Sequence, residues 1–248
     1  MSTVILSSYF TKKIHPNSVN DQHVVGRMEN NHIQNDFFPY IEKWYNSILK
    51  NKLNAVLFYD ELSADFVKKY ETDKIKFHKV GDFIYSNNDY RFFCFRNFLE
   101  ENKFDFVFHT DASDVVVVQD PSELFEKFKD FSFFACKDSI PLKHFPYLDV
   151  HKKYDWEDFF RCYLNNDTWD LINMGVVGGR YEDMLQFYNK FCETRIKMGD
   201  PNFNSDMWVL QYLLRVVFQH KSFMMGDPVC SEFKKYENKR EDVYFIHK

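Results

Sequence analysis

The apolar residues of the first two-thirds of the chain follow two alternating patterns. Short continuous apolar runs, typical of strands buried on both faces, alternate with segments whose apolar residues recur every three or four positions, as in helices. The expected strands are Thr3–Phe10, Asn54–Asp60, Lys74–Val80 and Phe104–Asp111. The expected helices between them are Phe37–Asn51, Leu62–Tyr70 and Asp89–Asn102. This repetition predicts an α/β fold with a central, mostly parallel open sheet flanked by helices.

The rest of the chain has a less regular pattern. Residues Ser139–Asp167 are polar, aromatic and typical of a loop, which suggests an insertion on the side of a bound acceptor. The other expected elements are a helix over Asp120–Asp130, a strand over Phe131–Asp138, a strand and turn over Trp169–Gly179, helices over Arg180–Gly199 and Asn204–Phe218, and a strand over Glu241–Lys248. There is no internal repeat or flexible linker, so we expect a single domain over residues 1–248.

Composition and charge exclude several classes of protein. A chain of 248 residues that is 45% hydrophobic and 19% aromatic has the apolar side chains that disordered proteins lack. The net charge of −5 leaves no broad basic surface, so nucleic acid is not an expected partner. The five cysteines are scattered without C-x-x-C spacing, which predicts buried reduced thiols. With no signal peptide and no apolar run of membrane-spanning length, a cytoplasmic location is expected.

The glycines are few and unevenly placed. The chain has 7, and three of them, Gly175, Gly178 and Gly179, lie within five positions. An average share of about 7% would give roughly 17 glycines in a chain of this length. A backbone without Cβ can lie close against a ligand, and the nearby Asn173 offers amide donors and an acceptor. A glycine hairpin turn with nothing bound explains the cluster equally well.

A pair of carboxylates follows a buried strand in the segment HTDASDVVVVQDP. Asp111 and Asp114 flank the turn after Phe104–Thr110, and ligands of parallel sheets bind beyond the carboxyl ends of the strands. Two carboxylates this close repel each other unless protons or a cation neutralise them, and their oxygens suit Mg²⁺ or Mn²⁺, which complete their shells with substrate phosphates. The alternative is a turn residue and a strand-end cap with no ligand.

Two further polar residues are ambiguous by themselves. Asp206 lies near the start of an expected helix, where the helix dipole stabilises a carboxylate and where aspartate is common. His247 ends the last apolar strand, and an isolated histidine in that position is more often incidental than a ligand.

Taken together, four segments carry a family resemblance. FVFHTDASDVVVVQDPSELF, LINMGVVGG, NSDMWVLQYLL and VYFIHK, in this order, resemble the GT-A-fold, nucleotide-sugar-dependent glycosyltransferases over roughly Val4 to His247. The likeness is greatest to small stand-alone enzymes, including some of large algal viruses.

Two features of the sequence depart from the family pattern. The carboxylates are spaced Asp-Ala-Ser-Asp instead of DxD, which leaves open which of them ligates a metal directly. Ser205-Asp206 replaces the usual Asp-Gln or Glu-Asp pair, which leaves the stereochemical class open.

The resemblance implies a role for each segment. It implies Mn²⁺ or Mg²⁺ on Asp111, Asp114 and His247, and Asp206 as the catalytic residue, either as the base of an inverting reaction or as a group that positions the donor in a retaining one. The residues implied to bind the donor or its nucleotide are Ser7, Ser8, Tyr9, Arg91, Asp111, Ala112, Ser113, Asn173, Gly175, Gly178 and Gly179. Among these, Tyr9 is expected to stack on the nucleobase. Arg91 is either a donor contact or a surface helix residue.

The expected function is metal-dependent transfer of a sugar from a nucleotide-diphosphate sugar, with UDP as the default, to a hydroxyl of a glycan or glycoconjugate. Residues up to about 120 form the expected nucleotide-binding half, and the remainder the donor-sugar and acceptor half.

A nucleotidyltransferase acting on sugar phosphates would have a glycine-rich loop after the first strand, which ILSSYFTKKIHP lacks. An aspartyl phosphatase would place its DxD motif early in the chain. A nucleotide- or glycan-binding module with weak catalysis would not need all four of Asp111, Asp114, Asp206 and His247. The identity of the sugar, the acceptor and the oligomeric state are left open.

Overall fold

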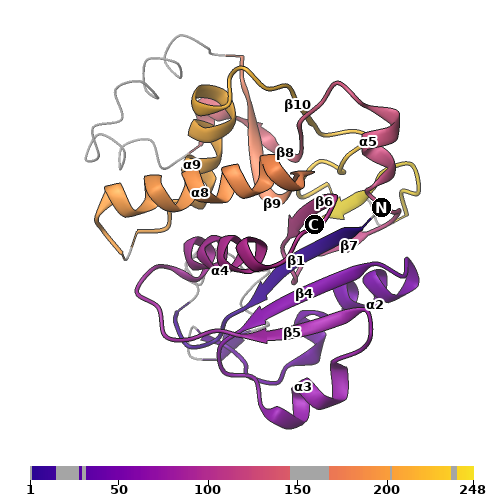
Figure 1. Ribbon diagram of the computed structural model, residues 1–248, viewed down its shortest axis with the longest axis vertical. Coiled ribbons are helices and arrows are strands. Elements are labelled where there is room, and N and C mark those ends of the chain that lie inside the picture. Colours follow the sequence, from indigo (N-terminus) through magenta and orange to yellow (C-terminus); the bar gives the residue numbers. More distant parts are fainter. Residues whose placement is uncertain (1, 15–27, 30–31, 146–167, 202, 236–238) are drawn as a thin grey trace.

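A seven-stranded sheet forms the centre of the molecule, with the strand order β10-β8-β9-β6-β1-β4-β5 (Figure 1). The computed structural model describes residues 2–14, 28–29, 32–145, 168–201, 203–235 and 239–248. Strand β1 (Thr3–Tyr9) pairs in parallel with both β4 (Asn54–Tyr59) and β6 (Phe106–Thr110), and β4 pairs in parallel with β5 (Ile75–Lys79). These are the four strands that the apolar runs predict.

The other half of the sheet contains one reversed strand. Strand β9 (Asp170–Arg180) pairs antiparallel with β6 on one side and with β8 (Phe133–Pro141) on the other, and β8 pairs in parallel with β10 (Phe223–Met225). The expectation of a mostly parallel sheet is confirmed. The glycine cluster lies inside the continuous strand β9 and not in a turn, so the predicted strand and turn over Trp169–Gly179 is a single strand.

Helices cover both faces of the sheet because successive strand residues point to opposite sides. On one face, Val4 and Leu6 pack with helices α4 (Asn87–Glu101) and α8 (Tyr181–Met198), which lie side by side (Figure 1). On the other face, Ile5 packs with residues of three helices. These helices are α2 (Glu42–Lys50), α3 (Ala64–Tyr70) and α5 (Glu123–Lys127).

Several elements are shorter than predicted. The helix expected from Phe37 begins as a 3-10 turn, η1 (Phe38–Tyr40), and the α-helix itself, α2, starts at Glu42. The helix expected over Asn204–Phe218 is α9 (Asp206–Tyr212), followed by a π turn, η3 (Leu213–Val217). Of the expected loop Ser139–Asp167, the first residues extend β8 and form a 3-10 turn, η2 (Leu142–His144), and residues 146–167 lie outside the described residues.

The described residues also form two small sheets. Strand β2 (Met28–Glu29) pairs with β3 (His32–Ile33). The C-terminal strand expected over Glu241–Lys248 is reduced to β11 (Phe245–His247). It pairs antiparallel with β7 (Val115–Val117), directly after the acidic turn, and not with the central sheet. This pairing brings the end of the chain to the carboxyl end of β6.

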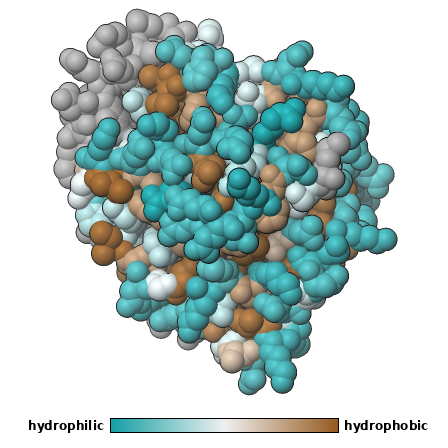
Figure 2. Space-filling model, in the orientation of Figure 1, coloured by the Kyte–Doolittle hydropathy of each residue, from teal (hydrophilic) through white to brown (hydrophobic). Residues whose placement is uncertain are grey.

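The surface is mainly hydrophilic on the face shown in Figure 2, where apolar residues form small separate groups. Among the residues described, the large apolar side chains that are exposed are Ile14, Ile84 and Ile196, which come from three different parts of the sequence. None of the helices in the described ranges combines the length and the apolar composition needed to cross a bilayer.

A substitution at Gly178 tests how closely the central strands pack. It lies opposite Phe108 in β6, and a Cβ built at Gly178 would be 2.0 Å from the Cδ1 atom of that ring. We therefore expect Gly178→Ala to lower the free energy of unfolding by about 1–3 kcal/mol through overpacking. Urea denaturation followed by circular dichroism measures this change.

The matched control is Gly81→Ala, because a Cβ at Gly81 would meet no atom within 4 Å. This variant should stay within about 0.5 kcal/mol of the unmodified protein. Equal stability of the two variants would contradict the close packing of Gly178 against Phe108.

Candidate metal and active site

Three potential metal ligands meet where β6 ends. Asp111 directly follows β6, and Asp114 lies in the turn that leads into β7. His247 is the last residue of β11 and pairs with Val115 across the small sheet. The amide of Lys248 also donates a hydrogen bond to the Asp114 carbonyl, at 3.1 Å. The pairing of β7 with β11 therefore joins residues that are far apart in the sequence.

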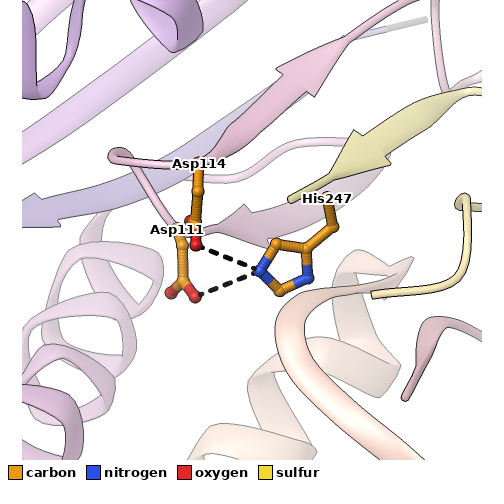
Figure 3. A group of neighbouring side chains, drawn as sticks. All are labelled: Asp111, Asp114 and His247. Carbon is orange, nitrogen blue, oxygen red and sulfur yellow. Dashed lines mark ion pairs between the residues drawn. The ribbon is translucent and has the colours of Figure 1, made fainter. Parts of the chain in front are cut away.

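The side chains of these three residues point toward one another (Figure 3). His247 Nε2 lies 3.8 Å from Asp111 Oδ2 and 3.6 Å from Asp114 Oδ2, and one ligand atom from each residue falls within 4.8 Å of the others. The histidine side chain is only 2% exposed, whereas those of Asp111 and Asp114 are 30% and 23% exposed. The group is thus closed on the imidazole side and open to solvent on the carboxylate side.

The charges of this group favour a cation. Burial by itself would lower the pKa of His247, but the Asp114 carboxylate, followed by the Cys136 thiol, outweighs it and raises that pKa well above its ordinary value. The carboxylates therefore favour positive charge at the imidazole. A divalent cation held by the same three side chains would supply that charge and displace the proton. Two carboxylates and one imidazole can all ligate a divalent cation, so these residues fit a metal site, whereas the choice between Mn²⁺ and Mg²⁺ stays a prediction.

The imidazole is held in place by a glycine and a phenylalanine. A Cβ built at Gly175 would lie 2.0 Å from His247 Cε1, and the ring of Phe233 packs against the imidazole with a centroid distance of 4.4 Å. The Gly175 carbonyl also accepts a hydrogen bond from the Asp111 amide, at 2.9 Å. Gly175 therefore positions both a carboxylate and the imidazole, a role for which the lack of a side chain is required.

Arg91 joins the acidic turn to the start of α9. Its Nη1 contacts Asp111, and its Nη2 lies 3.1 Å from Asp206 Oδ2. Its side chain is only 6% exposed, so Arg91 is not the surface helix residue that the sequence left as an alternative. The guanidinium lies between two carboxylates that would otherwise repel each other.

The two carboxylates that contact Arg91, those of Asp111 and Asp206, differ in their acidity. Burial raises the pKa of Asp206, and the Arg91 guanidinium only partly offsets this effect. Burial also acts on Asp111, but there Arg91 and His247 outweigh it, so the pKa of Asp111 is lowered. Asp111 is therefore the carboxylate suited to hold a cation, whereas Asp206 takes up a proton more readily than an ordinary aspartate does.

A second buried ion pair, which the sequence patterns did not indicate, holds the residue before Asp206. Asp89 accepts hydrogen bonds from the Ser205 amide at 3.1 Å and from the Ser205 hydroxyl at 3.2 Å, and Arg195 Nε donates to Asp89 at 2.7 Å. Burial and the neighbouring Asp206 raise the pKa of Asp89 to about 6, against the effect of Arg195. Asp89 is an acidic residue beside the aromatic positions of DYRFFCF, and this is the signal that could have identified it.

Asp138 is another residue that the sequence analysis missed. It accepts a hydrogen bond from Asn173 Nδ2 at 2.9 Å, and Asn173 Oδ1 in turn accepts one from the Gly175 amide at 2.8 Å. The amide of Asn173 is therefore oriented by an acidic residue on β8 and by the backbone beside His247. The available signal was the position of this aspartate, two residues after the apolar run FSFFAC.

The remaining predicted residues after β6 lie beside this group. Ala112 is buried and Ser113 is half-buried, and the Ser113 hydroxyl lies 3.1 Å from Asp114 Oδ1. On the neighbouring strand β1, Ser8 is half-buried, whereas Ser7 is fully buried and donates from its hydroxyl to the Thr110 carbonyl at 2.7 Å.

Tyr9 differs from its expected role. Its ring is fully buried and stacks on Tyr40 with a centroid distance of 4.8 Å, and its hydroxyl donates to the Gln34 carbonyl at 2.6 Å. Tyr9 therefore packs in the core beneath the end of β1 and presents no free face to a nucleobase.

Two of the three clustered glycines are explained by packing within the protein. The space beside Gly178 is filled by the Phe108 ring, and a Cβ at Gly179 would lie 2.8 Å from the Ser132 carbonyl oxygen. Of the cluster, Gly175 is the member that contacts the acidic group. A donor-binding role for Gly178 and Gly179 stays a prediction.

Gly175 provides a test of the metal site. We expect Gly175→Ala to weaken Mn²⁺ binding by roughly tenfold or more, because the added methyl group displaces the imidazole, as changes in the residues that orient metal ligands usually do. Isothermal titration with Mn²⁺ measures the affinity. In a His247→Ala background the same change should have little further effect. Equal losses in the two backgrounds would show that Gly175 does not act through His247.

No family model matches the chain, and no curated protein matches its sequence. Among solved structures, the chain is similar to an active-site mutant of LgtC, with a TM-score of 0.54 and 12% identity over 98% of this chain and 86% of that one. It is also similar to a glycosyltransferase involved in the glycosylation of the major capsid of PBCV-1, with a TM-score of 0.51 and 12% identity over 100% and 92% of the two chains.

A third similar structure is the galactosyltransferase LgtC in complex with donor and acceptor sugar analogs, with a TM-score of 0.51 and 12% identity over 98% of this chain and 86% of that one. At this level of identity the likeness concerns the fold. The chain therefore has the α/β fold of these GT-A glycosyltransferases over nearly its whole length.

Proposed function

We propose that this protein is a metal-dependent glycosyltransferase that moves a sugar from a nucleotide-diphosphate sugar, with UDP as the expected nucleotide, to a hydroxyl of a glycan or glycoconjugate. The observation that carries the proposal is the grouping of Asp111, Asp114 and His247, linked through Arg91 to Asp206, at the carboxyl end of the central strands. Ligands of open α/β sheets bind at this edge. The GT-A fold adds support for sugar transfer as the reaction.

Asp111, Asp114 and His247 would hold the metal ion in this proposal, and we expect Mn²⁺ in preference to Mg²⁺ because one ligand is an imidazole nitrogen. When bound, the ion supplies Lewis acidity toward the negative charge that develops on the departing nucleotide diphosphate. The open carboxylate side of the group leaves room for the phosphate oxygens of a donor.

Arg91 and Asp206 would act on the sugar side of the bond that breaks. The Arg91 guanidinium holds Asp206 at a fixed position relative to Asp111, and it adds positive charge close to the leaving group. If the enzyme inverts, Asp206 accepts the proton of the acceptor hydroxyl. If it retains, the same carboxylate stabilises the positive charge on the sugar ring. Both roles require the ionised form of Asp206.

Asn173 and Asp138 would hydrogen-bond the hydroxyl groups of the donor sugar. They lie on adjacent strands, and their mutual hydrogen bond fixes the orientation of the amide. Ser8, Ala112 and Ser113 lie at the ends of β1 and β6, where the backbone would line the nucleotide. In this proposal, one domain comprises a nucleotide-binding half up to about residue 120 and a donor-sugar and acceptor half beyond it.

The proposed function is tested by a donor screen that measures released nucleotide. The unmodified protein should bind one nucleotide-diphosphate sugar in the presence of Mn²⁺ and hydrolyse it slowly without an acceptor. Asp114→Ala should lose about 100-fold or more of this metal-dependent rate while keeping its fold. Asp65→Ala, which changes an exposed aspartate in α3, is the control and should keep the full rate.

A folded Asp114→Ala protein with unchanged activity and manganese response would remove the metal site from the proposal. Binding of a donor without any hydrolysis would instead indicate a nucleotide- or glycan-binding module. Anomeric assignment of the product then distinguishes inversion from retention.

The acidity of Asp206 leads to a prediction on pH dependence. Because its pKa is raised and its ionised form is required, the rate at saturating donor and Mn²⁺ should fall as the pH falls through a value above the ordinary aspartate pKa of about 4. Asp206→Asn should have a low rate that does not fall further in this pH range. If the fall in rate at low pH persists in Asp206→Asn and its midpoint shifts with the Mn²⁺ concentration, it arises from protonation of the metal ligands instead.

A further inference from the structure

Two cysteines that are far apart in the sequence meet behind the candidate metal site. The Sγ atoms of Cys136 on β8 and Cys230 lie 2.7 Å apart, across 94 positions of sequence. Both side chains are fully buried. Two sulfur atoms that are not bonded to each other ordinarily stay farther apart than this, so the surrounding structure holds the two thiols within reach of bond formation.

The backbone around Cys230 is fastened to β8 on both sides of Cys136. The Gly226 amide donates to the Ala135 carbonyl at 3.2 Å, and the Phe233 amide donates to the Lys137 carbonyl at 3.0 Å. These hydrogen bonds involve the residues directly before and after Cys136. Because a disulfide needs backbones that already lie close together, this arrangement allows the two sulfurs to be joined with little movement of the chain.

The same segment supports the strand that carries His247. The Ser231 amide donates to the Phe245 carbonyl at 2.9 Å, and the His247 amide donates to the Ser231 hydroxyl at 3.2 Å. Strand β11 is only three residues long, and these two hydrogen bonds attach it to Ser231 in addition to its pairing with β7. A covalent link at Cys230 would act directly on this attachment.

We propose that Cys136 and Cys230 form a modification site, a dithiol that a small two-electron oxidant closes into a disulfide and that thereby fastens the C-terminal strand to the central sheet. With hydrogen peroxide, the sulfur of one thiol bonds to a peroxide oxygen while the O–O bond breaks and one water leaves. The second thiol then attacks this sulfenic acid, the S–S bond forms, the S–O bond breaks and a second water leaves. The two thiols together lose two electrons and two protons, and the peroxide takes these up and is reduced to two waters.

The disulfide has two measurable consequences. It closes a long loop of the unfolded chain, so the oxidised protein should melt several degrees higher than the reduced protein. It also ties Ser231 to β8, so the amide hydrogens of Phe245 and His247 should exchange more slowly. Both effects are independent of the proposed sugar-transfer reaction.

The other described cysteines provide controls within the same molecule. Cys94 and Cys192 are buried as well, but for neither does the structure give a sulfur–sulfur hydrogen bond like that of Cys136 and Cys230. Cys94→Ser should therefore form the disulfide as the unmodified protein does. Cys230→Ser should not form it.

The experiment uses the full chain in its reduced form and treats it with hydrogen peroxide over a time course, since buried thiols react slowly. Mass spectrometry should show the loss of two hydrogens, and peptide mapping without reductant should join the peptides of Cys136 and Cys230. In a second arm, the reduced and unfolded chain refolds in a glutathione buffer. There glutathione disulfide is the oxidant, it is reduced to two molecules of glutathione, and access to the thiols does not limit the reaction.

The proposal is overturned if the refolded protein keeps both thiols free in the oxidising glutathione buffer, or if the joined peptides are those of other cysteines. It is also overturned if the Cys136–Cys230 disulfide forms but neither raises the melting temperature nor slows exchange at Phe245 and His247. Should Cys230→Ser fail to fold, the peptide map of the unmodified protein decides the question by itself.

Discussion

The organisation of the candidate site depends on a buried guanidinium. Arg91 contacts Asp111 at the end of β6 and Asp206 at the start of α9, and its own side chain is almost fully buried. A buried charge without partners is costly, and removing one partner of such a pair typically costs about 3–5 kcal/mol. The position of α4 against the sheet is therefore coupled to the positions of both carboxylates, and a displacement of either one removes an ionic partner from Arg91.

A second pair extends this constraint. Asp89 lies two residues before Arg91 on the same helix, and it holds Ser205 while pairing with Arg195 of α8. Asp206 is thus fixed from two sides, through its own side chain by Arg91 and through the preceding residue by Asp89. This gives α4 a role beyond covering the sheet, because it connects the end of a central strand to the beginning of α9.

The sequence predicted much of the fold and part of the site. The four parallel strands were identifiable because strands buried on both faces are continuous apolar runs. Asp111 and Asp114 were identifiable because they follow a buried strand at the edge of the sheet where ligands bind. Tyr9 was assigned wrongly to a free surface, because a polar aromatic residue at a strand end can face either a ligand or a second aromatic ring. Asp138 and Asp89 were missed because their partners lie on distant segments.

The sequence by itself determined the class of fold, the location of the acidic turn and the concentration of glycines, since each follows from local patterns of polarity and backbone freedom. Only the tertiary structure decided which of these features meet. The pairing of β7 with β11 brought His247 to the carboxylates, and the burial of Arg91 joined Asp111 to Asp206. Gly175 acquired its role from the imidazole packed against it, and Cys136 acquired a partner in Cys230. Such contacts arise from the packing of distant segments, which no local pattern in the chain encodes.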